Sequence, residues 1–192
     1  LQWLEVERLG AEVRPDPKKF PEFDAEFNAA ARREVVTFFN HIFSSDRSLL
    51  ELIDSDYTFV NARLARLYGI DGVSGSEFQR VKLTNRNRGG VTGMAAVHAL
   101  TSYPLRTSPV LRGRWILEAL LGDKVPPPPP DVPPLENTEG EVAHVSMRKQ
   151  LEQHRTKAEC AACHAKMDPL GFGLENFDDL GRWRDTDRGQ PI

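Results

Sequence analysis

The chain has two cysteines, three residues apart, and a histidine follows the second one in the string Cys160-Ala161-Ala162-Cys163-His164. On a helix, positions i, i+3 and i+4 share one face, so both thiols and the imidazole would project from one side of a single turn. Two such thiols can form thioethers with the two vinyl groups of one porphyrin, and the next residue can bring an imidazole to its iron. The motif therefore predicts one covalently attached c-type haem, with His164 as the proximal ligand.

Three other uses of these residues compete with haem attachment. A thioredoxin-like cysteine pair would follow a strand and open a helix, and the flanking sequence has no strand pattern. A structural zinc site needs four ligands; the sequence has no second Cys-X-X-Cys, although His154 and His164 could contribute. A disulfide between Cys160 and Cys163 would close a loop too short to stabilise the fold much. Zinc binding and thiol chemistry stay open as alternatives.

The composition excludes several classes of protein. The chain has 192 residues, with 25 Lys and Arg against 28 Asp and Glu. Because this balance leaves no excess positive charge to neutralise phosphates, no nucleic-acid partner is expected. No apolar run approaches the roughly 18 residues of a membrane span, so none is expected in this sequence. The sequence begins at Leu1 rather than at a methionine, and we expect a piece of a larger chain with flanking domains.

Helical patterns dominate the N-terminal half. Apolar residues recur at intervals of three and four over residues 23–43, and Asp24 is a plausible N-cap. Two further helices are predicted over residues 48–52 and 56–67, the second ending at Gly69. Only residues 78–83 alternate between apolar and polar side chains, which indicates one short strand.

The C-terminal half has the same character. A helix is predicted from Ser108-Pro109 to a stop at Gly122. Another is predicted over residues 146–166, broken by Asp168-Pro169. The sequence therefore predicts a mainly α fold, a helical c-type cytochrome module with irregular loops and a strand content below about 10%.

A run of prolines separates these two helical regions. Residues 126–130 are five consecutive prolines, and Pro133 and Pro134 follow. Neither a helix nor a paired strand tolerates such a run, so an extended polyproline arm is predicted, serving as a stiff spacer or as a ligand for an aromatic-lined groove. We expect an N-terminal helical domain over 1–85, a central helical segment with the arm over 86–135, and a haem attachment segment over 136–192.

Three blocks of sequence resemble a known family. They are residues 160–178, residues 56–61 with 67–70, and residues 101–104 with 106–113. Together they resemble the planctomycete-type cytochrome c proteins built from successive domains of unknown function. The resemblance implies a haem c protein in an exported location, the periplasm or the cell surface.

The opposite face of the iron needs a second ligand if the haem is six-coordinate. We predict Met94, which lies in a small-residue segment that would allow close approach to a flat cofactor. His98, four residues later, is the alternative, and an open site is the third possibility. Met167 follows His164 too closely to reach the opposite face and is expected to fill a packing gap.

The haem propionates need positively charged partners. Arg106 and Arg112 flank a turn rich in Ser and Thr and are the candidates for this role. The alternative role for both arginines is an exposed salt bridge.

Three functions fit these observations. The first is an electron-transfer module that passes single electrons to a redox partner protein or to flanking domains of a larger chain. The second is a haem peroxidase-like or other oxidoreductase domain with an open distal site, for which His98 is the candidate acid or base. The third is a binding module in which haem is only structural. The first is preferred, because nothing besides the haem motif has catalytic spacing.

Overall fold

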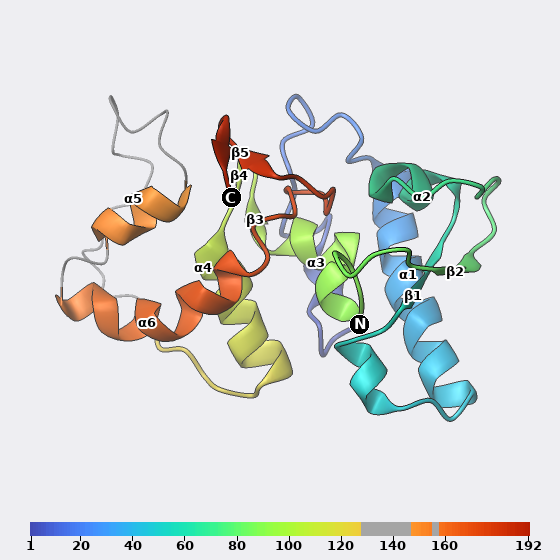
Figure 1. Cartoon of the computed structure of the whole chain (residues 1–192), viewed down its shortest axis with the longest axis horizontal. Helices are drawn as coiled ribbons and strands as arrows, with labels where there is room; N and C mark the ends of the chain where they lie inside the picture. Colours follow the sequence, from blue (N-terminus) through green and yellow to red (C-terminus); the bar gives the residue numbers. More distant parts are fainter. Residues whose placement is uncertain (128–146, 155–157) are drawn as a thin grey trace. The chain divides into compact units, whose positions relative to one another are not determined.

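Figure 1 shows a computed structural model that describes residues 1–127, 147–154 and 158–192. The chain divides into two compact units. Unit 1 comprises Leu1–Thr107 and Phe177–Trp183, and unit 2 comprises Ser108–Asn176 and Arg184–Ile192. Most of the predicted polyproline arm lies outside the described residues.

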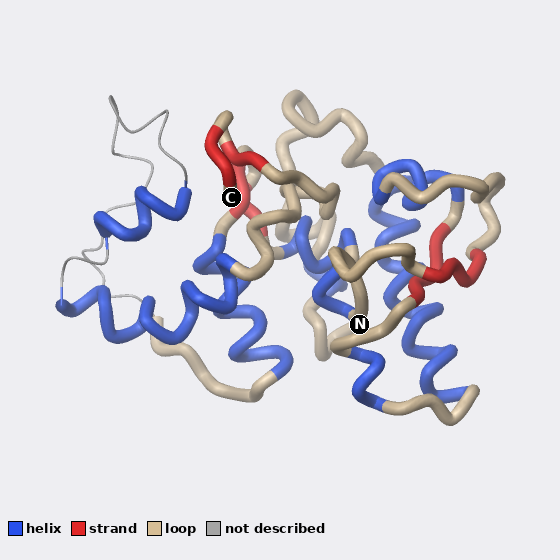
Figure 2. Tube along the Cα trace, viewed as in Figure 1, coloured by secondary structure: helices blue, strands red, loops and turns tan. Residues whose placement is uncertain are grey.

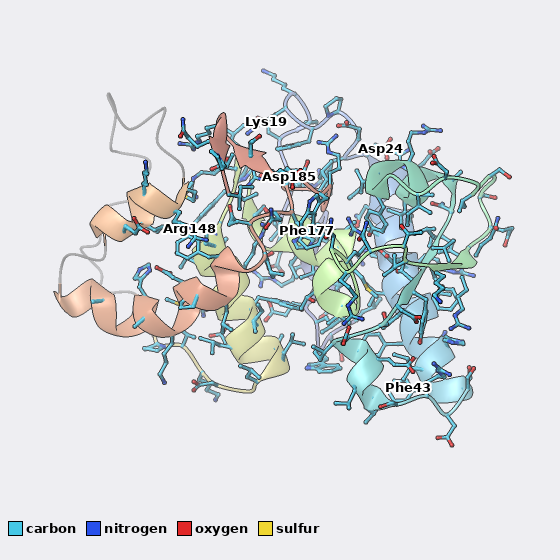
Figure 3. All side chains as sticks on the ribbon, in the orientation of Figure 1. Lys19, Asp24, Phe43, Arg148, Phe177 and Asp185 are labelled. Atoms are coloured by element: carbon cyan, nitrogen blue, oxygen red, sulfur yellow. The ribbon has the colours of Figure 1, made fainter. Side chains whose placement is uncertain are left out.

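The longest helix of unit 1 is α1, Ala25–Ser44. It begins where the sequence predicts, because an Asp24 carboxylate oxygen accepts the Phe27 N–H at 2.7 Å and satisfies one of the donors left open by the first turn. Its predicted apolar face is buried, except that Phe39 is only partly buried and Phe43 at the end of the helix is 65% exposed (Figure 3). The buried residues of α1 are Phe27, Ala30, Ala31, Glu34, Val35, Phe38 and Ile42.

The helix predicted over residues 56–67 is wrong in its first half. Residues Tyr57–Val60 form strand β1, which pairs antiparallel with β2, Gln79–Lys82. All four residues of β1 are buried, so the strand lacks the alternation that marks a half-exposed one. Helix α2, Ala62–Tyr68, starts only after this strand and ends at Gly69, whose φ of 68° suits glycine. The strand predicted at 78–83 is confirmed as β2.

The rest of unit 1 consists of short elements around a buried helix, α3, Ala95–Leu100, in which every residue is buried. Strands β3 and β4 form a two-stranded hairpin. The other short elements of unit 1 are η1 (Val6–Arg8), η2 (Leu49–Leu52), η3 (Val91–Gly93), β3 (Ser102–Tyr103) and β4 (Arg106–Thr107).

Unit 2 begins with helix α4, Pro109–Trp115. The predicted cap is confirmed, because Ser108 Oγ accepts the Leu111 N–H at 3.2 Å and Pro109 occupies the first turn. The helix continues as a π-helical turn, η4, and Gly122 follows with a φ of 69°. The remaining elements of unit 2 are η4 (Ile116–Leu120), α5 (Met147–His154), α6 (Ala158–Phe172), β5 (Thr186–Asp187) and β6 (Gln190–Pro191).

Helices α4 and α6 pack against each other more closely than any other pair of helices in the described part of the chain (Figure 1). Two glycines make this approach possible. A Cβ atom on Gly113 would lie 1.9 Å from the Met167 carbonyl oxygen, and one on Gly171 would lie 1.8 Å from the Pro109 carbonyl oxygen. Because Gly113 meets Met167 and Gly171 meets Pro109, the two helices run antiparallel, with backbone against backbone.

The predicted break at Asp168-Pro169 is also wrong. Helix α6 runs through Pro169 and ends at Phe172. A proline inside a helix removes one hydrogen bond to the preceding turn. Residues on both sides of Pro169 pack on α4, through Met167 and Gly171, so tertiary packing overrides the local preference.

The prediction of a mainly α fold is therefore corrected. The structure is 44% helix and 12% strand, with six α-helices and three small antiparallel sheets in the described residues (Figure 2). Four of the strands are only two residues long, too short to leave a period of two in the sequence. None of the described helices is long and apolar enough to cross a membrane.

Candidate functional site

Helix α6 carries Cys160, Cys163 and His164, the three residues of the sequence motif. The second cysteine and the histidine are partly buried, and the His164 side chain is 14% exposed. The helical register puts these three positions on one face, as the spacing predicts. This face also includes Met167, which is 5% exposed, so it continues into the packed side of the helix.

His164 is fixed by a carboxylate one turn further along the helix. Its Nδ1 atom lies 2.9 Å from an Asp168 carboxylate oxygen, and Asp168 is completely buried. Metal-binding histidines commonly donate one ring N–H to a carboxylate or carbonyl group, which fixes the ring and leaves metal binding to the other nitrogen. With Nδ1 directed at Asp168, Nε2 is the atom that would bind iron. The histidine thus fits the role of a proximal haem ligand.

The π-helical turn η4 contacts α6 in unit 2. Its Leu117 is buried, and the Asp123 side chain just beyond it pairs with Lys166 Nζ at 3.5 Å. π-helical turns are rare and occur frequently at functional sites. Through Leu117 and the other apolar residues of this turn, α6 has an apolar neighbour, and burial is one of the means by which proteins tune a haem.

Arg112, a predicted propionate partner, is buried in an internal network of unit 2. Its guanidinium lies 3.0 Å from the Glu175 carboxylate and donates to the Leu174 carbonyl at 2.7 Å. Glu175 also pairs with Arg184 at 3.1 Å. These bonds give Arg112 a structural role, and a role toward a propionate stays a prediction.

Arg106, the other predicted propionate partner, belongs to unit 1. Its guanidinium lies 4.4 Å from the ring centre of Tyr103 and donates to the Thr107 carbonyl at 3.2 Å. The structure thus places the two arginines in different units.

The two candidate distal ligands belong to unit 1. Met94 is 1% exposed and is the residue that precedes α3, in extended conformation, so it lies just outside the helix. His98 lies within α3, is completely buried, and stacks on Phe177 with ring centres 4.2 Å apart. Iron ligation by either residue stays a prediction.

Sequence reasoning missed a buried polar cluster in unit 1 around Glu34. Thr58 Oγ1 donates to one carboxylate oxygen of Glu34 at 2.8 Å, and Tyr68 Oη donates to the other at 2.6 Å. The Tyr68 hydroxyl in turn accepts the Ala95 N–H at 2.7 Å. The cluster joins α1, β1, α2 and α3.

A cation completes the cluster. The Arg88 guanidinium carbon lies 3.6 Å from the ring centre of Tyr68, and Arg88 donates to the Gly181 carbonyl at 2.5 Å. Burial raises the pKa of Glu34 from its usual 4.5 to about 7, although Tyr68 and Arg88 both favour its charged form. Burial also raises the pKa of Tyr68 and lowers that of Arg88. The sequence holds one signal for it: Glu34 lies four residues after Ala30 and four before Phe38, on the apolar face of the predicted helix.

The fold and the site together define a two-unit protein of mixed helix and short strands, with a Cys-X-X-Cys-His helix in unit 2. In the described residues, no three His, Cys, Asp or Glu side chains form a group that could hold a metal ion.

Residues 88–187, more than half of the chain, match the family described as "PSCyt3: Protein of unknown function (DUF1588)". The chain belongs to this family. Residues 1–70 match a second family, "PSD4: Protein of unknown function (DUF1592)". The matches confirm the resemblance to planctomycete cytochrome-type proteins built from successive domains of unknown function. No curated protein and no solved structure matches the chain.

Proposed function

We propose that this protein is a c-type cytochrome module that carries one haem c and transfers single electrons to a redox partner protein or to neighbouring domains. Cys160 and Cys163 would form the thioethers, and His164 would bind the iron. The observation that carries this proposal is the motif on helix α6, with Nδ1 of His164 held by buried Asp168. The family name also points to a cytochrome.

When bound, the haem supplies one-electron chemistry, and the residues of the chain hold and orient it. Helix α4 fixes α6 through the contacts at Gly113 and Gly171. Asp168 fixes the ring of His164. Both contacts position the helix that carries the motif and the histidine that would bind the iron.

The proposal includes an exported location, the periplasm or the cell surface. Haem c is attached outside the cytoplasm by dedicated machinery that acts on reduced thiols. We therefore expect holoprotein only from a host that exports the chain and has this machinery.

Covalent attachment is the first testable consequence. Protein matured in such a host should keep its haem through denaturing electrophoresis and give a pyridine haemochrome spectrum of haem c. A Cys160→Ser/Cys163→Ser double variant should lose all covalent haem, because both thioether sulfurs are gone. An Ala161→Ser/Ala162→Ser variant, which changes the same turn but keeps both thiols, should retain it. If acid-acetone extracts the haem from the wild-type protein, the proposal is wrong.

The distal ligand is the second consequence. We propose Met94 on its sequence alone, because it lies in a small-residue segment remote in sequence from His164. The oxidised protein should then be low-spin, with the weak far-red band of an iron–thioether bond, and Met94→Ala should remove the band and lower the reduction potential. Met167→Ala should change stability more than the spectrum.

Two other results would contradict this ligand. If His98→Ala produces a high-spin spectrum while Met94→Ala leaves it unchanged, His98 is the ligand. A wild-type protein that is already high-spin would favour the peroxidase-like alternative, because its distal site would be open.

A further inference from the structure

We infer that Asp168 is a positioning residue that makes His164 a stronger electron donor to the haem iron and so lowers the reduction potential of this protein. The inference rests on the proposed haem attachment. It adds to that proposal a residue that sets the reduction potential. Asp168 would not touch the haem itself and would act through the imidazole of His164.

The contact is short and shielded from water. Nδ1 of His164 lies 2.9 Å from the Asp168 carboxylate, within hydrogen-bond distance. The Asp168 side chain is 0% exposed and that of His164 is 14% exposed. A charged acceptor makes a stronger hydrogen bond than a neutral one, and burial strengthens it further because water does not screen it.

Helix geometry holds the two residues in place. They are four residues apart on α6, so their side chains meet on one face. Residues on either side of Asp168 are fixed against α4, Met167 by its backbone contact with Gly113 and Gly171 by its contact with Pro109. The backbone of α6 on both sides of Asp168 is therefore held against α4.

A carboxylate in this position acts on the iron in two ways. By accepting the Nδ1–H, it increases the basicity of Nε2 and strengthens its donation to the metal. Its negative charge also stabilises the more positive, oxidised form of a nearby iron through a medium of low dielectric constant. Both effects favour the oxidised state, and they oppose the rise in potential that a Met94 thioether would cause.

The test replaces only the charge. Asp168→Asn keeps a side chain of the same size that can still accept from Nδ1, so covalent haem content and far-ultraviolet circular dichroism should match the wild type. Its midpoint potential, measured by spectroelectrochemistry on the holoprotein, should rise by at least about 59 mV, a tenfold change in the ratio of reduced to oxidised protein at a fixed potential. Asp168→Glu, which restores the charge, should return the potential toward the wild-type value.

Asp123→Asn is the matched control. Asp123 is also a carboxylate beside α6, but its side chain is 52% exposed and pairs with Lys166 rather than with His164. Its removal should leave the potential within a few millivolts of the wild-type value, since exposed charges are screened. If Asp123→Asn and Asp168→Asn shift the midpoint potential equally, the effect of Asp168 comes from its charge alone and not from its contact with His164. That result would overturn the inference.

A second measurement keeps the inference testable if Asp168→Asn matures poorly. In the Cys160→Ser/Cys163→Ser chain without haem, nitrogen NMR should show the His164 proton on Nδ1. A proton on Nε2 would overturn the inference. If the wild-type holoprotein forms but Asp168→Asn keeps its potential, only this inference fails, whereas a wild-type chain without covalent haem refutes the proposed function itself.

Discussion

Gly171→Ala is expected to destabilise unit 2 by about 3 kcal/mol or more, because the new methyl group has no space. Its Cβ would lie 1.8 Å from the Pro109 carbonyl oxygen and 2.5 Å from the carbonyl carbon. These are backbone atoms of α4, so no side-chain rotation relieves the overlap and the two helices must separate. Gly113→Ala should have the same effect, since its Cβ would meet the Met167 carbonyl oxygen at 1.9 Å.

Gly173→Ala provides the control for this prediction. A Cβ at Gly173 finds its nearest neighbour, the Leu170 carbonyl oxygen, at 3.4 Å, which is an ordinary contact. Urea unfolding followed by circular dichroism, with hydrogen exchange of the α4 and α6 amides, would measure the change. Gly173→Ala should stay within about 0.5 kcal/mol of the wild type. A Gly171→Ala variant as stable as Gly173→Ala would refute the close packing of α4 on α6.

Glu34 should make unit 1 less stable as the pH rises from about 5 to 7. The pKa of Glu34 is raised from 4.5 in the unfolded chain to about 7 in the folded one, so the folded state holds its proton more tightly. The stabilisation is fully present below pH 4.5 and is lost as the pH rises through 7. This difference in pKa corresponds to a loss of about 3 kcal/mol in the free energy of unfolding.

Glu34→Gln isolates this effect. The amide keeps the shape of the side chain and an oxygen that can accept from Thr58, but it carries no charge to bury. At pH 8 we expect the variant to be more stable than the wild type, and at pH 4.5 to be of similar or lower stability. Urea unfolding at several pH values would show whether the two curves converge at low pH.

Glu26→Gln on the same helix is the control, because the Glu26 side chain is 84% exposed. It should unfold with the same pH dependence as the wild type. Asp24 and Glu51 have lowered pKa values, so their contributions are lost as the pH falls; they are present in all three proteins and cancel in the comparison. Parallel curves for Glu34→Gln and the wild type would refute the raised pKa.

Local signals in the sequence predicted an element correctly where residues at its own ends fix where it begins or stops. Asp24 and Ser108 cap helices as predicted, and Gly69 ends one, because each satisfies open backbone groups or accepts a positive φ. The apolar spacing of residues 23–43 likewise identified the buried face of α1, because a period of 3.6 residues leaves a regular trace.

Local signals failed where distant segments decide the structure. Strand β1 exists because Gln79–Lys82 pairs with it, and its four buried residues read equally well as part of a helix. Helix α6 continues through Pro169 because α4 packs against both sides of that residue. Ending the predicted helix at residue 166 also hid the contact of Asp168 with His164, although their spacing of four is visible in the sequence.

The sequence by itself was enough to predict the family and to propose the residues of the candidate site. Cys160, Cys163 and His164 lie within five residues, so one helical turn is enough to bring them together. Only the tertiary structure decided which carboxylates are buried. The spacing of α1 places Glu34 on its apolar face, but each of Glu34 and Asp168 becomes completely buried only because other helices and strands cover it. A pKa and a hydrogen bond to a ligand both depend on the loss of water around such groups, and that is a property of packing rather than of local spacing.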